Sequence, residues 1–88
     1  MEITKVNIIK YDDEYRINNH LSKNTLAAVD LVIDYNIAVK GIQLMGGQKG
    51  EYLIFPEDNK GRTIAFPINE ETRLNILNLV LKEYNSEG

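Results

Sequence analysis

The chain has 88 residues, which is enough for one domain with a small core, and its 13 acidic and 10 basic side chains give a formal net charge of −3. It contains no cysteine, which excludes disulfides and cysteine-bound zinc as sources of stability, so oligomerisation is the remaining common one. The net charge also excludes attraction of an anionic partner by the field of the whole molecule, and leaves such a partner only a local basic patch. We therefore expect a single domain over residues 1–88 that forms a homodimer.

The beginning of the chain, MEITKVNII, lacks the basic start and the apolar length of a signal peptide. No apolar run reaches the ~20 residues that span a bilayer. Together with the absence of cysteine, these features predict a cytoplasmic protein without a membrane partner.

The first half of the chain alternates between strand patterns and polar segments. In ITKVNII, the residues Thr4, Val6 and Ile8 fall on one side at period two, which favours a strand. Residues 10–25 are polar, rich in Asn and Asp and without periodicity, so we expect a long polar connection there. The next segment is LAAVDLVID, which alternates again and predicts a half-buried strand before a turn at residues 34–36.

The return strand, IAVKGIQLM, changes the phase of its apolar residues. Ile37 and Val39 occupy odd positions, whereas Ile42 and Leu44 occupy even ones. One extra residue at Lys40-Gly41, a β-bulge, reconciles the two halves, because glycine accepts the backbone angles that a bulge often needs. The sequence therefore predicts a bulge at Gly41.

Two Phe-Pro pairs frame the segment that follows. GGQKG predicts a hairpin loop, and EYLIF a fourth strand that ends at Pro56. Residues 62–66, RTIAF, fit a short fifth strand that Pro67 stops. Phe55 and Phe66, each directly before a proline, are expected in the core.

The last part of the chain predicts an amphipathic helix over residues 70–84. Asn69 offers an N-cap, and Glu70 and Glu71 place negative charge in the first turn, where the helix dipole favours it. Apolar residues recur at three- and four-residue steps at Leu74, Leu77, Leu81 and Tyr84, with Ile76 and Val80 widening the stripe. We expect an α+β fold, an antiparallel β-meander of four to five strands with one C-terminal helix packed on the sheet and a frayed tail at residues 85–88.

The order and spacing of these features resemble the SpoVG family, small bacterial proteins named for stage V sporulation and septation. The matching features are the strand that closes on Ile33-Asp34, the Val-x-Gly-Ile step from Val39 to Ile42, the Gly-rich turn ending at Gly50, Pro56, the segment Arg62-x-Ile64-Ala65-x-Pro67-Ile68, Thr72-Arg73 and Glu83-Tyr84. Nearly the whole chain is covered, apart from residues 10–25, which are several residues longer than in the family.

The resemblance implies a homodimeric regulator of septation, sporulation or gene expression that binds DNA or RNA. It implies contact residues in the loop after the fourth strand and at the helix start, namely Lys60, Arg62 and Arg73. In two places this chain departs from the family. Glu57-Asp58 stands where members usually carry Ser-Lys or Lys-Arg, and Phe66 stands where the family has His.

The same three cations also have purely structural interpretations. Lys60 and Arg62 fit ordinary solvated charges at a hairpin tip, and Arg73 fits a partner of Glu70 or Asn69. A protein-interaction module on the same fold, still dimeric but without nucleic-acid binding, is therefore the alternative function. The regulator requires the three cations of both subunits on one continuous face, which distinguishes the two hypotheses.

The expected dimer contact is a strand edge, because an unprotected edge is a template for another chain. The candidate region is residues 36–45, with the bulge bending the strand toward its partner. The interface residues that we predict are Ile37, Val39, Gly41, Ile42 and Leu44.

Residues for catalysis or metal binding are scarce. His20 is the only histidine, and no cysteine or paired serine gives it a nucleophile to activate. The carboxylates of residues 12–14 lack EF-hand spacing, and GGQKG lacks the Gly-Lys-Ser/Thr ending of a phosphate loop. We expect no enzyme activity, cofactor, metal or small-molecule substrate.

Overall fold

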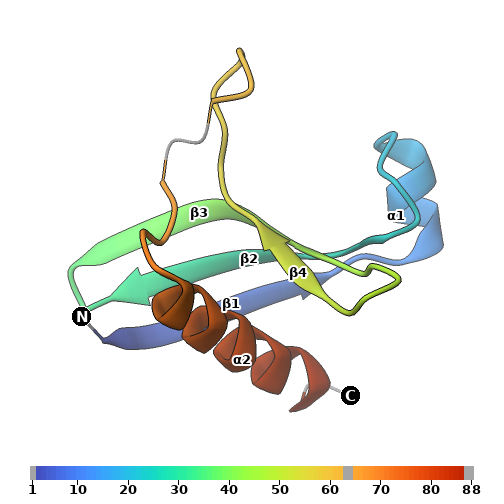
Figure 1. Ribbon diagram of the computed structural model, residues 1–88. Coiled ribbons are helices and arrows are strands. Elements are labelled where there is room, and N and C mark those ends of the chain that lie inside the picture. Colours follow the sequence, from blue (N-terminus) through green and yellow to red (C-terminus); the bar gives the residue numbers. More distant parts are fainter. Residues whose placement is uncertain (1, 63–64, 87–88) are drawn as a thin grey trace.

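A computed structural model describes residues 2–62 and 65–86 of the chain (Figure 1). The elements are, in order, β1 (Ile3–Lys10), α1 (Asp13–Asn18), β2 (Thr25–Ile33), β3 (Ile37–Met45), β4 (Tyr52–Ile54) and α2 (Glu70–Ser86). Each strand pairs antiparallel with the next, in the order β1-β2-β3-β4. The predicted α+β class, a meander with a C-terminal helix on the sheet, is confirmed. The fifth strand that we considered over residues 62–66 includes residues 63 and 64, which lie outside the described residues.

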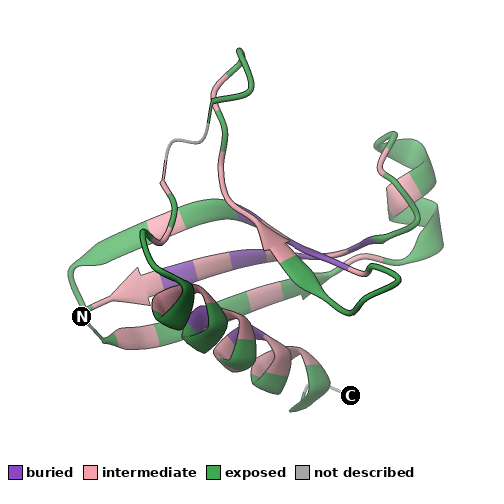
Figure 2. Ribbon diagram, in the orientation of Figure 1, coloured by how far each residue is buried: buried purple, intermediate pink, exposed green. Residues whose placement is uncertain are grey.

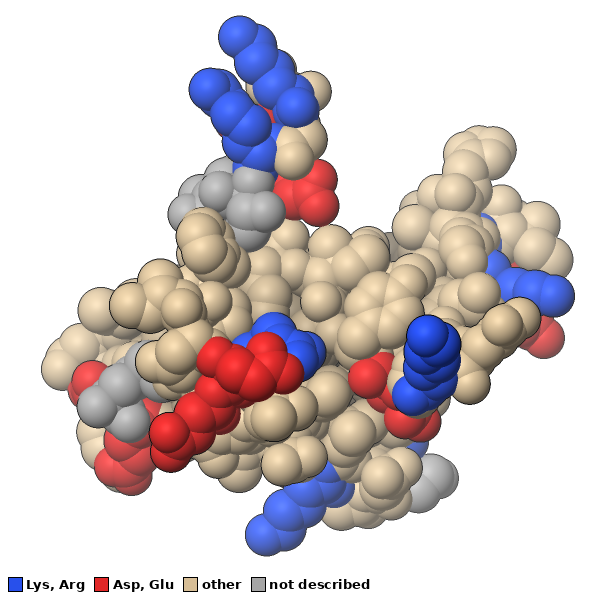
Figure 3. All heavy atoms as spheres, viewed as in Figure 1, with Lys and Arg blue, Asp and Glu red and all other residues tan. Residues whose placement is uncertain are grey.

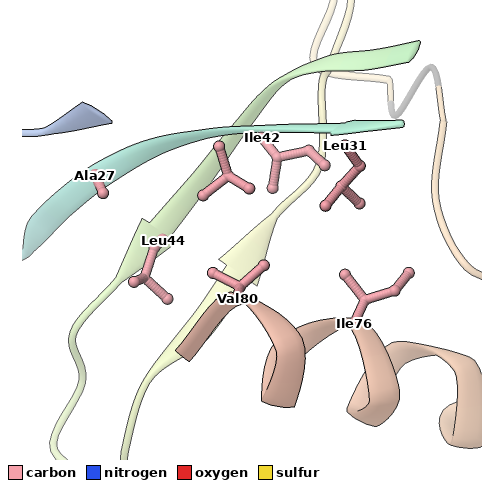
Figure 4. Packing of buried hydrophobic residues seen from close by; sticks show 7 residues of the cluster. Ala27, Leu31, Ile42, Leu44, Ile76 and Val80 are labelled. Atoms are coloured by element: carbon pink, nitrogen blue, oxygen red, sulfur yellow. The ribbon is translucent and has the colours of Figure 1, made fainter. Parts of the chain in front are cut away.

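The core lies between α2 and the two central strands. Figure 2 shows the buried residues on β2, β3 and the helix face that meets them, and in Figure 4 Ile76 and Val80 point from α2 toward the side chains of the sheet. The fully or nearly fully buried cluster consists of Ala27, Val29, Leu31, Ile42, Leu44, Ile76 and Val80. Period-two alternation in β2 puts every second side chain into this layer, as predicted.

The helix is rotated relative to the predicted stripe. Ile76 and Val80 are its buried residues, whereas Leu77 packs at the side and Leu74 is 44% exposed. Leu74 lies two residues before Ile76 and therefore roughly 200° from it around the helix, since each residue turns about 100°. The prediction that Leu74 belongs to the packed face is therefore wrong, because the apolar residues span more of the circumference than the sheet covers.

The segment 10–25 is structured, which corrects the expectation of a connection without periodic structure. β1 continues to Lys10, and α1 begins after Asp12, whose carboxylate accepts a hydrogen bond from the Tyr15 backbone N–H at 2.8 Å. The Arg16 guanidinium donates to the backbone carbonyl of Thr25 at 3.1 Å and so joins the helix to the start of β2. A helix of six residues is too short to show a repeating pattern, and its anchor is a tertiary contact.

The predicted β-bulge is confirmed. Val29 pairs with Ile42 and Leu31 pairs with Val39, so a single residue of β2 faces two residues of β3. Gly41 is one of those two residues and has φ +84°, a left-handed conformation that favours glycine. The bulge thus returns the apolar residues of both halves of β3 to one face.

The two phenylalanines differ in burial. Phe55 packs half-buried against the core, as expected, but Phe66 is 60% exposed. The prediction that Phe66 is a core residue is therefore wrong.

In the described part of the chain, neither helix combines the length and the apolar character that a bilayer crossing requires.

Candidate nucleic-acid interface

The chain between β4 and α2 carries a tight turn that rises away from the sheet (Figure 1). Its ends are held by a backbone hydrogen bond from the Asp58 N–H to the Arg62 carbonyl at 2.7 Å, and the Gly61 N–H donates to the Asp58 carbonyl at 3.0 Å. Gly61 has φ +78°, which a residue with a side chain rarely adopts. The backbone therefore closes the turn around residues 58–62, which we call the tip loop.

The carboxylate of Asp58 organises the tip loop. Its Oδ1 accepts from the backbone N–H groups of Lys60 and Arg62, each at 2.9 Å, and its Oδ2 accepts from Arg62 Nε at 2.7 Å. The hydrogen bond from the Arg62 backbone is the largest cause that lowers the pKa of Asp58 below its usual value, ahead of the Lys60 amide and the Arg62 side chain. The charged carboxylate is thus the form that this loop holds.

Lys60 and Arg62 are both exposed, and the Arg62 side chain has 73% of its surface accessible. Figure 3 shows Lys and Arg atoms gathered at the outermost end of this loop, with Asp and Glu atoms below them. A guanidinium or ammonium group presented in this way can donate hydrogen bonds to a phosphate. The sequence predicted these two cations at a hairpin tip, and the structure places both in the turn between β4 and α2.

Arg73 lies in the first turn of α2, where it pairs with Glu70. Its Nε donates to Glu70 Oε2 at 3.1 Å, and its terminal nitrogen contacts Glu70 Oε1. This hydrogen bonding raises the pKa of Arg73 and lowers the pKa of Glu70. Asn69 instead caps the helix, since its side-chain oxygen accepts from the Thr72 N–H at 2.7 Å. The structural interpretation of Arg73 as a partner of Glu70, and the predicted N-cap, are both confirmed.

Each arginine of the predicted set therefore faces a carboxylate of its own chain. Arg62 pairs with Asp58 and Arg73 pairs with Glu70. In Figure 3 the cationic tip and the charges at the start of α2 are visible from the same side, with uncharged side chains between them. Within one protomer the tip loop and the helix start are thus two separate groups of charge.

Next to the tip loop, the sheet and the helix start enclose an apolar hollow of about 150 Å³. Its lining residues are Leu31, Ile33, Val39, Phe55, Ala65, Phe66, Pro67, Thr72 and Ile76. Phe66 stands at this hollow and is 60% exposed. The surface position of Phe66 could not be predicted, because a phenylalanine before a proline gives no signal of exposure in the sequence.

The predicted dimer residues lie in two environments. Ile42 and Leu44 are fully buried in the protomer's own core, so their side chains do not reach a partner. Ile37 is 58% exposed, Gly41 is exposed and Val39 is half-buried. The β3–β4 ladder covers only Gln43–Met45, so among the described residues the first part of β3 pairs with β2 alone. The interface stays a prediction, narrowed to the edge at residues 37–41.

Metal binding has no support in the described ranges 2–62 and 65–86, where no group of three or more His, Cys, Asp or Glu side chains is placed to hold an ion.

Comparison with known proteins connects this arrangement to a family. The sequence model of the SpoVG family matches residues 1–86. This chain belongs to the SpoVG family. The protein named "Putative septation protein SpoVG" from Agathobacter rectalis is 34% identical over 91 residues, covering 99% of this chain and 95% of the relative. Its namesake from Acetivibrio thermocellus is 34% identical over 90 residues, with 98% and 87% covered.

A relative of the same name from Bacillus cytotoxicus is 30% identical over 92 residues, covering 100% of this chain and 87% of the relative. The SpoVG family membership that the motifs indicated is therefore confirmed over almost the whole chain. The names of these relatives describe septation proteins.

Proposed function

We propose that this chain is a homodimeric regulator that binds DNA or RNA through phosphate groups, with Lys60, Arg62 and Arg73 as contact residues. The observation that supports it best is the tip loop, where Asp58 holds a turn that projects two exposed cations. The names of the relatives associate the family with septation, and we propose that the regulated process is septation.

Phosphate binding would share each guanidinium between its carboxylate and the nucleic acid. The Arg62–Asp58 and Arg73–Glu70 pairs lie on the surface, and ion pairs of this kind contribute little net stability. A phosphate can therefore bind the same guanidinium beside the carboxylate, and it releases counterions from the nucleic acid as it does so. A dimer would double the three cations. The regulator requires that the dimer bring the tip loops and the helix starts, which are separate within one protomer, onto one face.

The dimer would form at the edge of β3. Its first part has a free ladder side among the described residues, and Ile37 offers apolar surface beside it. Ile37→Lys should convert the dimer to a folded monomer in sedimentation at micromolar concentration, because a charge in the contact is desolvated. Ile9→Lys is the matched control, since Ile9 is also an exposed strand residue, on β1. A folded monomer of the wild type at that concentration contradicts the homodimer.

The binding proposal is tested by salt titration with random and selected duplexes and single strands. Six cations predict a slope of log affinity against log salt of about −5 on duplex DNA, at roughly −0.9 per neutralised phosphate. Arg62→Glu combined with Arg73→Glu should abolish binding without unfolding the protein, because both side chains lie on the surface.

The matched control is Lys23→Glu combined with Lys49→Glu, which changes the charge equally at two exposed positions outside the proposed contact surface. The control should keep most of the affinity and the slope. Absence of salt-sensitive binding by the wild type at about 50 mM salt rejects the regulator.

The second candidate is a dimeric protein-interaction module on the same fold. Two observations favour it, namely the carboxylate beside each arginine and the exposed ring of Phe66 at the apolar hollow. It becomes the better account if the titration finds no nucleic-acid binding and sedimentation still finds a dimer.

A further inference from the structure

We infer that Asp58 is a positioning residue that supports nucleic-acid contact, whereas its neighbour Glu57, with the same charge, opposes it. The inference rests on the proposed function and deepens it. It assigns opposite roles to two adjacent carboxylates of equal charge.

The two carboxylates have different surroundings. Asp58 has a side chain that is only 27% exposed, and it accepts from two backbone N–H groups and from the Arg62 guanidinium. The Glu57 carboxylate has no hydrogen bond or ion pair with a described residue. It points beside the turn, where one of its oxygens would lie 3.9 Å from a Cβ added at Gly61. Glu57 is thus negative charge near the tip, and Asp58 is part of the structure of the tip.

Loss of the Asp58 carboxylate would leave its donors without a protein partner. The N–H groups of Lys60 and Arg62 would turn to water, and Arg62 Nε would lose the contact that orients its guanidinium. A long side chain that is ordered before binding loses less conformational entropy on binding. Asp58 therefore favours phosphate contact by holding Lys60 and Arg62 in place, and this benefit exceeds the repulsion from its own, already paired charge.

The direction of the affinity change in two variants separates a positioning role of Asp58 from a pure effect of its charge. Glu57→Gln and Asp58→Ala each remove one negative charge per protomer, so an account based on charge alone predicts that both tighten binding equally. Positioning predicts opposite signs. Glu57→Gln should tighten binding roughly two- to tenfold at low salt, the effect of one charge within a Debye length. Asp58→Ala should weaken it roughly fivefold, the effect of ordering one long side chain on binding.

Asp58→Asn provides the conservative variant. Its amide oxygen still accepts from the two backbone N–H groups, while its charge is removed. We expect affinity closer to the wild type than that of Asp58→Ala, although both variants have the same charge. The probe is a random-sequence DNA duplex at fixed low salt, and tightening by Asp58→Ala to the extent seen with Glu57→Gln overturns the inference.

A second measurement keeps the inference testable without binding. The backbone ¹H–¹⁵N resonances of Lys60 and Arg62 should lose the signature of their hydrogen bonds in Asp58→Ala, and keep it in Asp58→Asn and Glu57→Gln. Unchanged resonances in Asp58→Ala overturn the positioning role. If the wild type binds no nucleic acid, the proposed function fails together with the role of Asp58 in binding, and changed resonances in Asp58→Ala then show only that Asp58 organises the tip loop.

Discussion

Ile42→Ala should lower the free energy of unfolding by about 2–5 kcal/mol, the range for truncation of a large apolar side chain in a core. Ile42, on β3, is fully buried in the layer between the sheet and the helix residues Ile76 and Val80 (Figure 4). The loss combines the transfer of the removed carbon atoms with the cavity that the surrounding strands and helix cannot fill. Chemical denaturation at a fixed protomer concentration measures the effect.

Ile9→Ala is the matched control for Ile42→Ala. Ile9 is also an isoleucine in a strand, but it is 67% exposed. Its truncation should change the free energy of unfolding by less than about 0.5 kcal/mol, as is usual at surface positions. Equal losses at Ile42 and Ile9 would show that the helix does not cover the sheet face that contains Ile42.

Gly41→Val should destabilise the fold by roughly 1–3 kcal/mol through backbone strain at the bulge. Gly41 has φ +84°, a conformation that is unfavourable for a β-branched residue. The added Cβ itself meets no overlap, since it would lie 3.6 Å from Pro56 Cβ, an ordinary contact. If the chain escaped the strain by shifting register, apolar residues of β3 would turn to solvent, so that route is also unfavourable.

Gly46→Val is the control for Gly41→Val. A Cβ at Gly46 would make an ordinary contact with Leu26 at 3.5 Å, and its φ lies outside the left-handed region. It should therefore lose less stability than Gly41→Val in the same denaturation experiment. Gly47 is a poorer control because an added Cβ would lie 3.0 Å from the Gly50 carbonyl oxygen. Similar losses at Gly41 and Gly46 would argue against strain at the bulge.

Local chemistry was sufficient to predict much of the fold. The phase change of apolar residues in β3 identified the bulge, because only one inserted residue returns Ile42 to the face of Val39. The N-cap at Asn69 could be predicted because its partner, the Thr72 N–H, is three residues away. The ion pair of Arg73 could also be predicted, because its partner Glu70 is one helical turn away.

Contacts between residues far apart in the sequence determined α1, the packed face of α2 and the exposure of Phe66. α1 depends on Arg16 reaching the carbonyl of Thr25 on a neighbouring strand, and no local pattern reports such a contact. Only the packing of α2 on the sheet decided that Ile76 and Val80, and not Leu74, face the core. The exposure of Phe66 likewise follows from the path of the chain over the apolar hollow.

The tip loop shows where sequence and tertiary structure divide. Sequence alone determined that Glu57 and Asp58 adjoin two cations, and therefore that charge near the tip is mixed. Only the folded turn decided that the Asp58 carboxylate accepts hydrogen bonds from the amides of Lys60 and Arg62, while the Glu57 side chain lies beside the turn. The physical reason is that a hydrogen bond depends on direction and distance, which follow from the path of the folded backbone, including the positive φ of Gly61. Which charged residue types lie near one another along the chain can be read from the sequence itself.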